Sequence, residues 1–351
     1  MQGRLGVTGP QMMSRPREEG LLRIITVEEH FHHPEAIARV LELAGPPPVA
    51  PDGGFGEVLR GFMPDQDSAE RLGGNRLAHM DRVGIDVQVV SHGANSPGNL
   101  PHPEAVELCK RVNDALAQQI SEHPIRFRGF ATLPLHEPAA AADELKRCVN
   151  ELGFVGTLIA GSCGGLFLDD ERFDPVLTAA ETLDLPIYVH PGVPENPVSR
   201  AYYAGNWPAA IHFLFSGPAF GWHAEAGIHI LRLFMSGALD RHPRLKLLSG
   251  HWGEFVAGWL DRLDEVVSWG GTHLERQVSA YYREQVWATP SGMYSQNQLN
   301  FIVAEVGAER IIYSEDFPYV VRDNVSEFLE QADLTDDQRT AIAHRNAEEI
   351  M

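Results

Sequence analysis

The sequence predicts an α/β protein whose strands close into a distorted (β/α)8 barrel, with extra helices at the C-terminus. Eight short apolar runs alternate with segments of helical periodicity. None of these runs shows the polar alternation of a sheet with one solvated face, which indicates parallel strands covered on both sides. A chain of 351 residues is long enough for one large domain of this kind. An open, doubly wound sheet is the alternative, but no GxGxxG motif opens the first crossover.

The strands are expected where apolar residues run together between turn signals, and the helices where apolar residues recur every three or four positions. The expected strands cover residues 21–25, 85–90, 127–132, 155–159, 186–190, 245–249, 285–288 and 310–314. The expected helices cover residues 34–43, 75–83, 102–121, 138–152, 174–183, parts of 205–239, 254–267 and 295–306, with two more at the C-terminus. These elements predict a single domain over residues 21–351.

Two segments fall outside this alternation. Residues 1–20 lack the apolar core of a signal peptide and are interpreted as a leader or a disordered arm. Residues 45–61 are rich in Gly and Pro and are expected to form a long surface loop. The aromatic-rich segment 205–235 is predicted to be core for the most part, with a subunit interface or a pocket wall as alternatives.

Composition excludes several classes of partner. The formal net charge is −20, from 48 acidic and 28 basic residues, which argues against nucleic acid and against an anionic membrane surface. A small anionic substrate is still compatible with this charge, because a metal ion or a few arginines can dominate the local field. The longest apolar runs are too short to span a membrane. Three cysteines without CxxC spacing predict no disulfide framework and favour the reducing cytoplasm.

Carboxylates and imidazoles gather where the predicted strands end. In a regular strand, residues i and i+2 point the same way, so Glu28 and His30 converge while Glu29 faces the other side. The later strand ends carry Ser91-His92, His190, His251 and Asp316. A single histidine at a strand end is more often structural than ligating. Their joint occurrence at the carboxyl ends of strands 1, 5, 6 and 8 predicts a mononuclear divalent metal site with an open coordination position.

His251 lies in the segment Gly250-His251-Trp252-Gly253-Glu254, whose glycines permit a tight turn after the strand. Glu254 is expected at the start of the following helix, from which it can turn back and hydrogen-bond the imidazole. Such a partner fixes the tautomer and raises the basicity of the ring, which suits a proton carrier. Arg262 follows eight residues later, either as an anion-binding or catalytic partner or as an exposed, structurally paired side chain.

Several motifs together resemble the amidohydrolase superfamily, from about residue 22 to the C-terminus. The segments 96–98, 229–237 and 242–246 are also similar to its amidohydrolase-2 branch. That branch holds aminocarboxymuconate semialdehyde decarboxylase and the γ-resorcylate-type hydroxybenzoate decarboxylases. The motifs are Glu28-x-His30, Tyr188-Val189-His190-Pro191, Gly250-His251-Trp252-Gly253-Glu254 and Ser314-Glu315-Asp316-Phe317-Pro318.

The resemblance implies a distorted TIM barrel that binds one Zn²⁺ or Mn²⁺ and assembles as a homodimer or homotetramer. Glu28, His30, His190 and Asp316 match the metal ligands of the family. His251 and Asp316 match its catalytic residues, with Glu254 and Arg262 at supporting positions. The loops 45–61 and 161–165 have no match, and they leave the substrate open.

These features predict a metal-dependent, non-oxidative decarboxylase of a hydroxylated aromatic, or related conjugated, carboxylic acid. Glu28 favours this activity, because most amidohydrolases have His or Asp at that position, whereas a Glu there resembles the aromatic acid decarboxylases. Either Asp316 or His251 is expected to deliver the proton. The alternatives are a metal-dependent hydrolase, such as a lactonase or an amidohydrolase, that uses the same site, and a barrel that binds a metal or a small acid without catalysis.

Overall fold

The computed structural model describes residues 22–44, 63–271 and 273–351. The predicted leader at 1–20 and the predicted surface loop at 45–61 lie outside the described residues.

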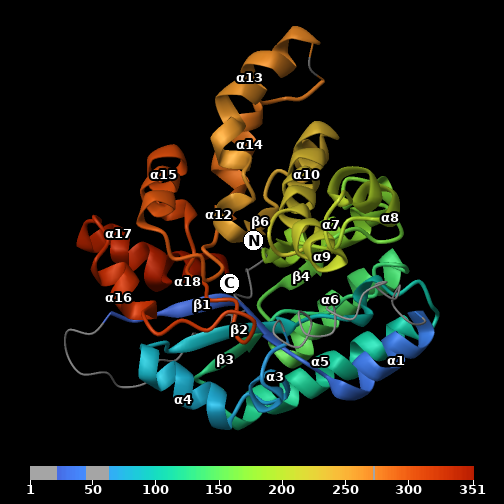
Figure 1. The fold of residues 1–351 in the computed structure, drawn as a ribbon, viewed down its shortest axis with the longest axis vertical. Coiled ribbons are helices and arrows are strands. Elements are labelled where there is room, and N and C mark those ends of the chain that lie inside the picture. Colours follow the sequence, from blue (N-terminus) through green and yellow to red (C-terminus); the bar gives the residue numbers. More distant parts are fainter. Residues whose placement is uncertain (1–21, 45–62, 272) are drawn as a thin grey trace, which may run out of the picture.

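Parallel strands form the centre of the molecule, as the sequence predicts (Figure 1). Two sheets are present, one with the order β1-β2-β3 and one with the order β4-β5-β6-β7. The strands are β1 (Ile25–Phe31), β2 (Val87–His92), β3 (Phe127–Gly129), β4 (Thr157–Ala160), β5 (Pro186–His190), β6 (Lys246–Ser249) and β7 (Val286–Ala288).

Isolated parallel bridges join the two sheets into a ring. The bridge between Ala131 and Thr157 connects the end of β3 to β4. On the other side, Ala288 pairs with Ile311, and Ser314 pairs with Val27 of β1. Residues 311–314 therefore occupy the eighth strand position of a (β/α)8 barrel through single bridges instead of a regular strand. This confirms the predicted fold class.

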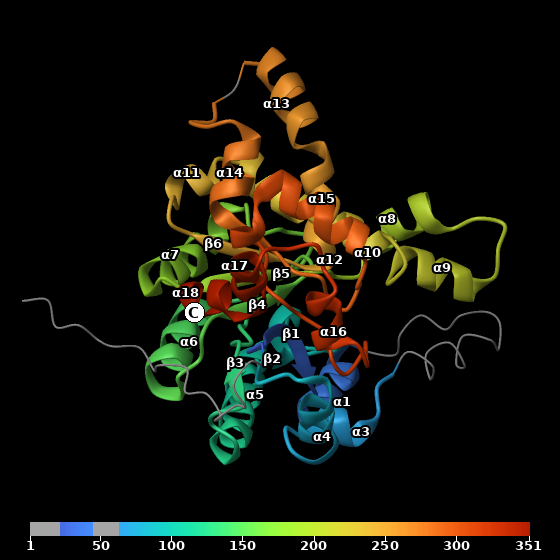
Figure 2. The ribbon, with the colours of Figure 1, turned by 90° about the vertical axis from the view of Figure 1, so that its left-hand side faces the viewer.

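Helices lie between consecutive strands and cover the outside of the ring (Figures 1 and 2). Both views show α13 and α14 extending away from the strands, and Figure 2 shows α8 and α9 projecting from the side of the barrel. The α-helices are α1 (Pro34–Ala44), α3 (Gln66–Glu70), α4 (Gly74–Val83), α5 (Ala105–Glu122), α6 (Pro138–Leu152), α7 (Asp174–Leu183), α8 (Asn196–Val198), α9 (Ala209–Ser216), α10 (Gly221–Met235), α11 (Ala238–Arg241), α12 (Gly250–Gly253), α13 (Leu260–Trp269), α14 (Val278–Gln285), α15 (Gln296–Val306), α16 (Val325–Glu330), α17 (Asp336–Thr340) and α18 (Asn346–Ile350). Short 3-10 turns are η1 (Pro97–Asn99), η2 (Glu171–Phe173), η4 (Val256–Trp259) and η5 (Ala308–Arg310), and π turns are η3 (Ser199–Tyr203) and η6 (Ala341–Arg345). None of the described helices combines the length and the apolar character needed to cross a bilayer.

Two hydrophobic clusters form the core. The larger one lies between the strands and the surrounding helices. The smaller one fills the interior of the ring and takes one or two side chains from most of the strands. It also includes Ala347 and Ile350 of α18, so the C-terminal helix packs against the barrel interior. The interior residues include Ile25, Val27, Val87, Val89, Phe130, Tyr188, Leu248 and Ile312.

A β-bulge in β1 corrects the simple alternation expected for Glu28 and His30. The register with β2 shifts between Thr26 and Glu29, and Glu28 has a φ of 72°. In a regular strand, Val27 and Glu28 would face opposite sides. The extra residue of the bulge reverses the alternation, so that Glu28 and His30 turn to the interior face that Val27 already occupies. The predicted convergence of Glu28 and His30 is present, but it depends on the bulge and lies within β1 instead of beyond its end.

Two further expectations are wrong in detail. The helix predicted for 254–267 begins only at Leu260, and His251, Trp252, Glu254 and Phe255 all have positive φ. The segment labelled α12 is therefore a left-handed turn. The aromatic residues in 205–235 are not core for the most part. Phe234 is buried, but Trp207, Phe215 and Phe220 are exposed, and Phe213 and Trp222 are partly exposed.

Candidate active site

Four side chains from three barrel positions meet at the carboxyl ends of the strands. β1 supplies Glu28 and His30, β5 supplies His190, and the segment after the eighth strand position supplies Asp316. The His30 Nε2 atom lies 3.2 Å from Asp316 Oδ1, and the His190 Nε2 atom lies 3.8 Å from Glu28 Oε1. The rings of His30 and His190 are 5.2 Å apart and nearly perpendicular. Their polar atoms thus face one common point.

The hydrogen bonds of this cluster leave free the atoms that a metal ion would need. Within the described residues, Glu28 Oε1, His30 Nε2 and Asp316 Oδ1 are buried and have no hydrogen-bond partner. The other ring nitrogens are occupied: Nδ1 of His30 lies 3.0 Å from Ser91 Oγ, and Nδ1 of His190 donates to the Pro191 carbonyl at 2.8 Å. Such contacts fix the tautomer that presents Nε2 to an ion. This donor set fits one Zn²⁺ or Mn²⁺.

Hydroxyl groups orient the Glu28 carboxylate. Its Oε2 atom accepts hydrogen bonds from Ser291, from Thr289 at 3.1 Å and from Ser314 at 3.4 Å. Ser291 Oγ also accepts the backbone N–H of His251 at 2.8 Å. One carboxylate oxygen is therefore saturated while the other faces the imidazoles, which favours a monodentate ligand.

Burial sets the protonation of the cluster. It raises the pKa of Glu28 to about 7 and that of Asp316 to about 8, because the charged carboxylates lose their hydration. It also lowers the pKa of His30 to about 3 and that of His190 well below its usual value. The imidazoles are neutral, as ligands must be, and the two carboxylates are costly without a nearby cation.

A hydrogen-bonded triad stands beside the cluster. Glu254 Oε1 accepts from His251 Nδ1 at 2.7 Å, and Oε2 accepts from Nδ1 of His223 at 3.1 Å. His251 Nδ1 lies 4.0 Å from Glu28 Oε1. Burial raises the pKa of Glu254 to about 7, against the opposing effect of His223. These three residues are close enough to ligate an ion. Their facing atoms, however, are already hydrogen-bonded to one another, so the four-residue cluster is the better metal site.

The left-handed turn after β6 places this triad. Gly253 has a φ of 79°, and a Cβ atom there would collide with the buried Tyr282 hydroxyl. His223 comes from α10 and is missing from the residues predicted from the sequence. It follows no motif, and the ring contact with His251, with centroids 4.2 Å apart, arises only when α10 packs on the turn.

The structure does not bring Arg262 to this site. Arg262 lies on α13, pairs with Glu265 at 3.0 Å and has 58% of its side chain exposed. Its guanidinium also stands over the Trp269 ring. Of the two alternatives that the sequence left open, the exposed, structurally paired arginine is the one present. The helical register that suggested otherwise does not exist, because Glu254 and Arg262 are separated by the left-handed turn and by η4.

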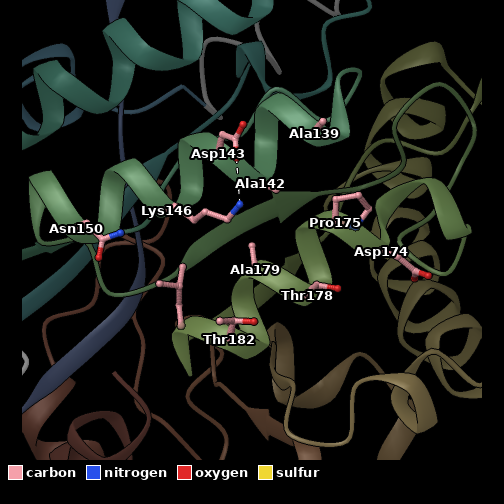
Figure 3. Close-up of a pocket in the computed structure, with 11 residues that line it drawn as sticks. Ala139, Ala142, Asp143, Lys146, Asn150, Asp174, Pro175, Thr178, Ala179 and Thr182 are labelled. Atoms are coloured by element: carbon pink, nitrogen blue, oxygen red, sulfur yellow. Dashed lines mark hydrogen bonds and ion pairs between the residues drawn. The ribbon is translucent and has the colours of Figure 1, made fainter. Parts of the chain in front are cut away.

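A cavity of about 690 Å³ lies on the outside of the barrel, between α6 and α7 (Figure 3). Alanines and a proline line much of it, and Asp143 and Lys146 form an ion pair of 3.1 Å at one wall. None of its lining residues belongs to the metal cluster or the triad. The cavity is therefore separate from the candidate active site.

Parallel strands alternating with helices, with carboxylates and imidazoles converging at the strand ends, define a barrel enzyme of the metal-dependent class. The chain belongs to the amidohydrolase family, whose model matches residues 27–350. It is 35% identical to the decarboxylase orsB of Emericella nidulans over 93% of this chain and 96% of that protein. It is 34% identical to a gamma-resorcylate decarboxylase of Rhodococcus jostii over 92% and 96% of the two chains. A dihydroxybenzoic acid decarboxylase of Polaromonas sp. JS666, solved with bound manganese and the inhibitor 2-nitroresorcinol, superposes with a TM-score of 0.80 at 31% identity, covering 94% and 97% of the chains.

Proposed function

We propose that this protein is a metal-dependent, non-oxidative decarboxylase of a hydroxylated aromatic or closely related conjugated carboxylic acid. The observation that carries the proposal is the position of the His251–Glu254 pair beside three buried oxygen and nitrogen atoms that lack a hydrogen-bond partner. These are Glu28 Oε1, His30 Nε2 and Asp316 Oδ1. Decarboxylases similar to this chain over more than nine-tenths of its length support the same reaction class. The proposed cofactor is one Zn²⁺ or Mn²⁺, held by Glu28, His30, His190 and Asp316.

When bound, the divalent ion supplies positive charge that holds the substrate carboxylate and its neighbouring hydroxyl oxygen. The residues of the chain then handle the proton. The ring carbon that bears the carboxylate takes a proton from Asp316 or through His251, the bond to the carboxyl carbon breaks, CO₂ leaves, and the electron pair restores the aromatic ring. Glu254 keeps the His251 Nδ1 atom protonated, so Nε2 is the nitrogen available for transfer.

The test is CO₂ release from a panel of hydroxybenzoates, compared with hydrolysis of a panel of lactones and amides. We expect CO₂ release, and His251→Ala should abolish it while the metal content stays unchanged. His344→Ala is a matched control, because it removes a similar bond, with His344 Nδ1 2.9 Å from Glu348 Oε2, outside the site. Full activity in His251→Ala would remove the role assigned to this histidine. Turnover of lactones or amides without CO₂ release would favour the hydrolase hypothesis.

We also propose a homodimer or homotetramer that forms through an exposed aromatic surface made of Trp207, Phe215, Phe220 and Phe255. These rings contact one another in sequence, with centroids 6.4, 6.1 and 5.4 Å apart, yet between 37% and 52% of each residue is exposed. Apolar patches of this kind mark contact surfaces. Light scattering should show that Phe215→Asp lowers the mass to that of one chain, whereas Ile125→Asp, also at an exposed apolar residue, does not. A monomeric wild-type protein would contradict the proposal.

We further propose that the protein resides in the cytoplasm. Cys109, Cys148 and Cys163 are all free and buried, which suits a reducing compartment.

A further inference from the structure

The Glu29 carboxylate holds the backbone on both sides of Asp316. Glu29 is fully buried and lies on the face of β1 opposite to Glu28 and His30. Its Oε1 atom accepts the backbone N–H of Glu315 at 3.1 Å, and its Oε2 atom accepts that of Phe317 at 2.7 Å. Both oxygens of one carboxylate are thus spent on the two residues that flank Asp316 in the sequence.

The backbone of Asp316 needs such support. Its φ is 69°, in the left-handed region that residues other than glycine rarely adopt, and such conformations persist only where the surroundings impose them. The His30 N–H also donates to the Phe317 carbonyl at 2.7 Å, so the same segment is tied to β1 through two neighbouring residues. The direction of the Asp316 side chain, 3.2 Å from the His30 Nε2 atom, follows from this backbone.

A buried guanidinium lies behind β1, near the Glu29 carboxyl group, whose pKa is raised by burial and by the neighbouring Glu315. The side chain of Arg76 on α4 is fully buried, donates to the Ser68 and His30 carbonyls, and stands 4.8 Å over the Phe317 ring. Burial lowers the pKa of Arg76 to about 10, and the carboxylates of Glu29 and Glu315 oppose that shift, so the guanidinium is charged at neutral pH.

We propose that Glu29 is a positioning residue of the metal site: by fixing the peptide groups around Asp316, it sets the affinity of the protein for its divalent ion. The inference rests on the proposed ligand role of Asp316. It differs from a purely structural role, in which Glu29 would only join β1 to the eighth strand position and would leave ion binding unchanged.

The test is the affinity of chelator-treated protein for Mn²⁺, measured by competition with a fluorescent chelator. In Glu29→Gln, the amide oxygen still accepts one backbone N–H, but the amide nitrogen faces the other one. We expect an affinity about 10- to 100-fold lower than in the wild type, as for other residues that orient metal ligands. Excess Mn²⁺ should restore most of the turnover.

Glu144→Gln is the matched control. Glu144 is also a buried carboxylate that accepts hydrogen bonds at both oxygens, but it lies on α6. Its donors are Asn113 at 2.7 Å, Arg147 at 2.7 and 2.8 Å, and Cys148 at 3.4 Å. This variant should melt at a lower temperature and bind Mn²⁺ within about twofold of the wild type, because only the orienting contacts of a ligand change affinity.

An unchanged Mn²⁺ affinity in Glu29→Gln, or an equal loss in Glu144→Gln, would overturn the inference and leave a structural role. If Glu29→Gln does not fold, Glu29→Asp gives the same decision, since the shorter side chain keeps the carboxyl group but cannot reach both N–H groups. Asp316→Asn tests the proposed ligand set separately from the role of Glu29. Wild-type affinity in that variant would refute the proposed ligand set itself, whatever Glu29 does.

Discussion

Lowering the pH from about 8 to about 6 should weaken Mn²⁺ binding by roughly a thousandfold. The pKa of Asp316 is raised to about 8 and that of Glu28 to about 7, so both carboxyls take up protons over this range in chelator-treated protein. The ion must displace one proton between pH 8 and 7 and two between pH 7 and 6, which costs about tenfold and then about a hundredfold in affinity. His30 and His190 are not expected to add protons here, because burial lowers the pKa of His30 to about 3 and that of His190 well below its usual value.

The same two shifts act in the opposite direction on the stability of the protein without its ion. A carboxyl whose pKa is raised on folding contributes stability that is fully present below its unfolded pKa, near 4, and is lost as the pH rises through its folded pKa. Glu28 and Asp316 should therefore lower the melting temperature of chelator-treated protein as the pH rises from 5 to 8. Added Mn²⁺ should raise the melting temperature more at pH 8 than at pH 5.

Affinity is measured at each pH by competition with a chelator whose own proton binding is known. Asp316→Asn provides the internal check, because it removes one of the two titrating carboxyls. Its affinity should be lower overall and should fall by no more than about tenfold per pH unit below pH 7. A wild-type affinity that is constant between pH 6 and 8, or a two-proton slope in Asp316→Asn, would refute the role of these two carboxyls in ion binding.

Three further variants test other parts of the structure. His223→Ala should lower turnover about 10- to 100-fold at unchanged metal content, because it removes one partner of the Glu254 carboxylate, which orients the imidazole proposed to be catalytic; wild-type turnover would contradict this. Ser291→Ala should weaken Mn²⁺ affinity about tenfold in the competition assay, since it frees the carboxylate of the proposed ligand Glu28 to turn, and an unchanged affinity would show that the remaining hydroxyls suffice. Gly253→Ala should lower the free energy of unfolding by about 3 kcal/mol, because the added methyl collides with the Tyr282 hydroxyl. Gly153→Ala, which has a φ of 70° and nothing within 4 Å, should cost only about 1 kcal/mol in the same denaturant titration, so equal losses would argue against the collision.

Much of the fold could be predicted because local signals and tertiary structure agree in it. The predicted bounds of α6 and α7 are the observed ones, since each helix has a proline in its first turn and ends at a left-handed residue, Gly153 or Asp184. The helix after β6 was misplaced because a run of left-handed residues follows His251, and most of them are not glycines. No propensity identifies such a turn, because contacts made elsewhere in the barrel impose it.

The residues of the candidate site likewise differ in whether local sequence signals or tertiary contacts place them. The side chains at strand ends could be predicted, because parallel strands deliver their carboxyl ends to one rim wherever the sheet closes. His223 could not be predicted, since it reaches the triad from within a helix and shares no spacing with the motifs. The bulge in β1 left no mark in the sequence either, although it decides which way Glu28, Glu29 and His30 point.

The packing of the C-terminal helix α18 bears on the order in which the metal ion and the substrate bind. Ala347 and Ile350 of α18 pack with interior residues from the starts of the strands, such as Ile25 and Val87, so this helix lies toward the end of the ring opposite to the proposed ligands. Glu28 and His30 are buried, whereas His190 and Asp316 keep 21% and 14% of their side chains exposed, so an organic acid that reaches an ion held by these four residues would cover it from the side of His190 and Asp316. We therefore expect the metal to bind before the substrate and to leave after the product. A bound substrate or inhibitor should therefore slow the removal of the ion by a chelator.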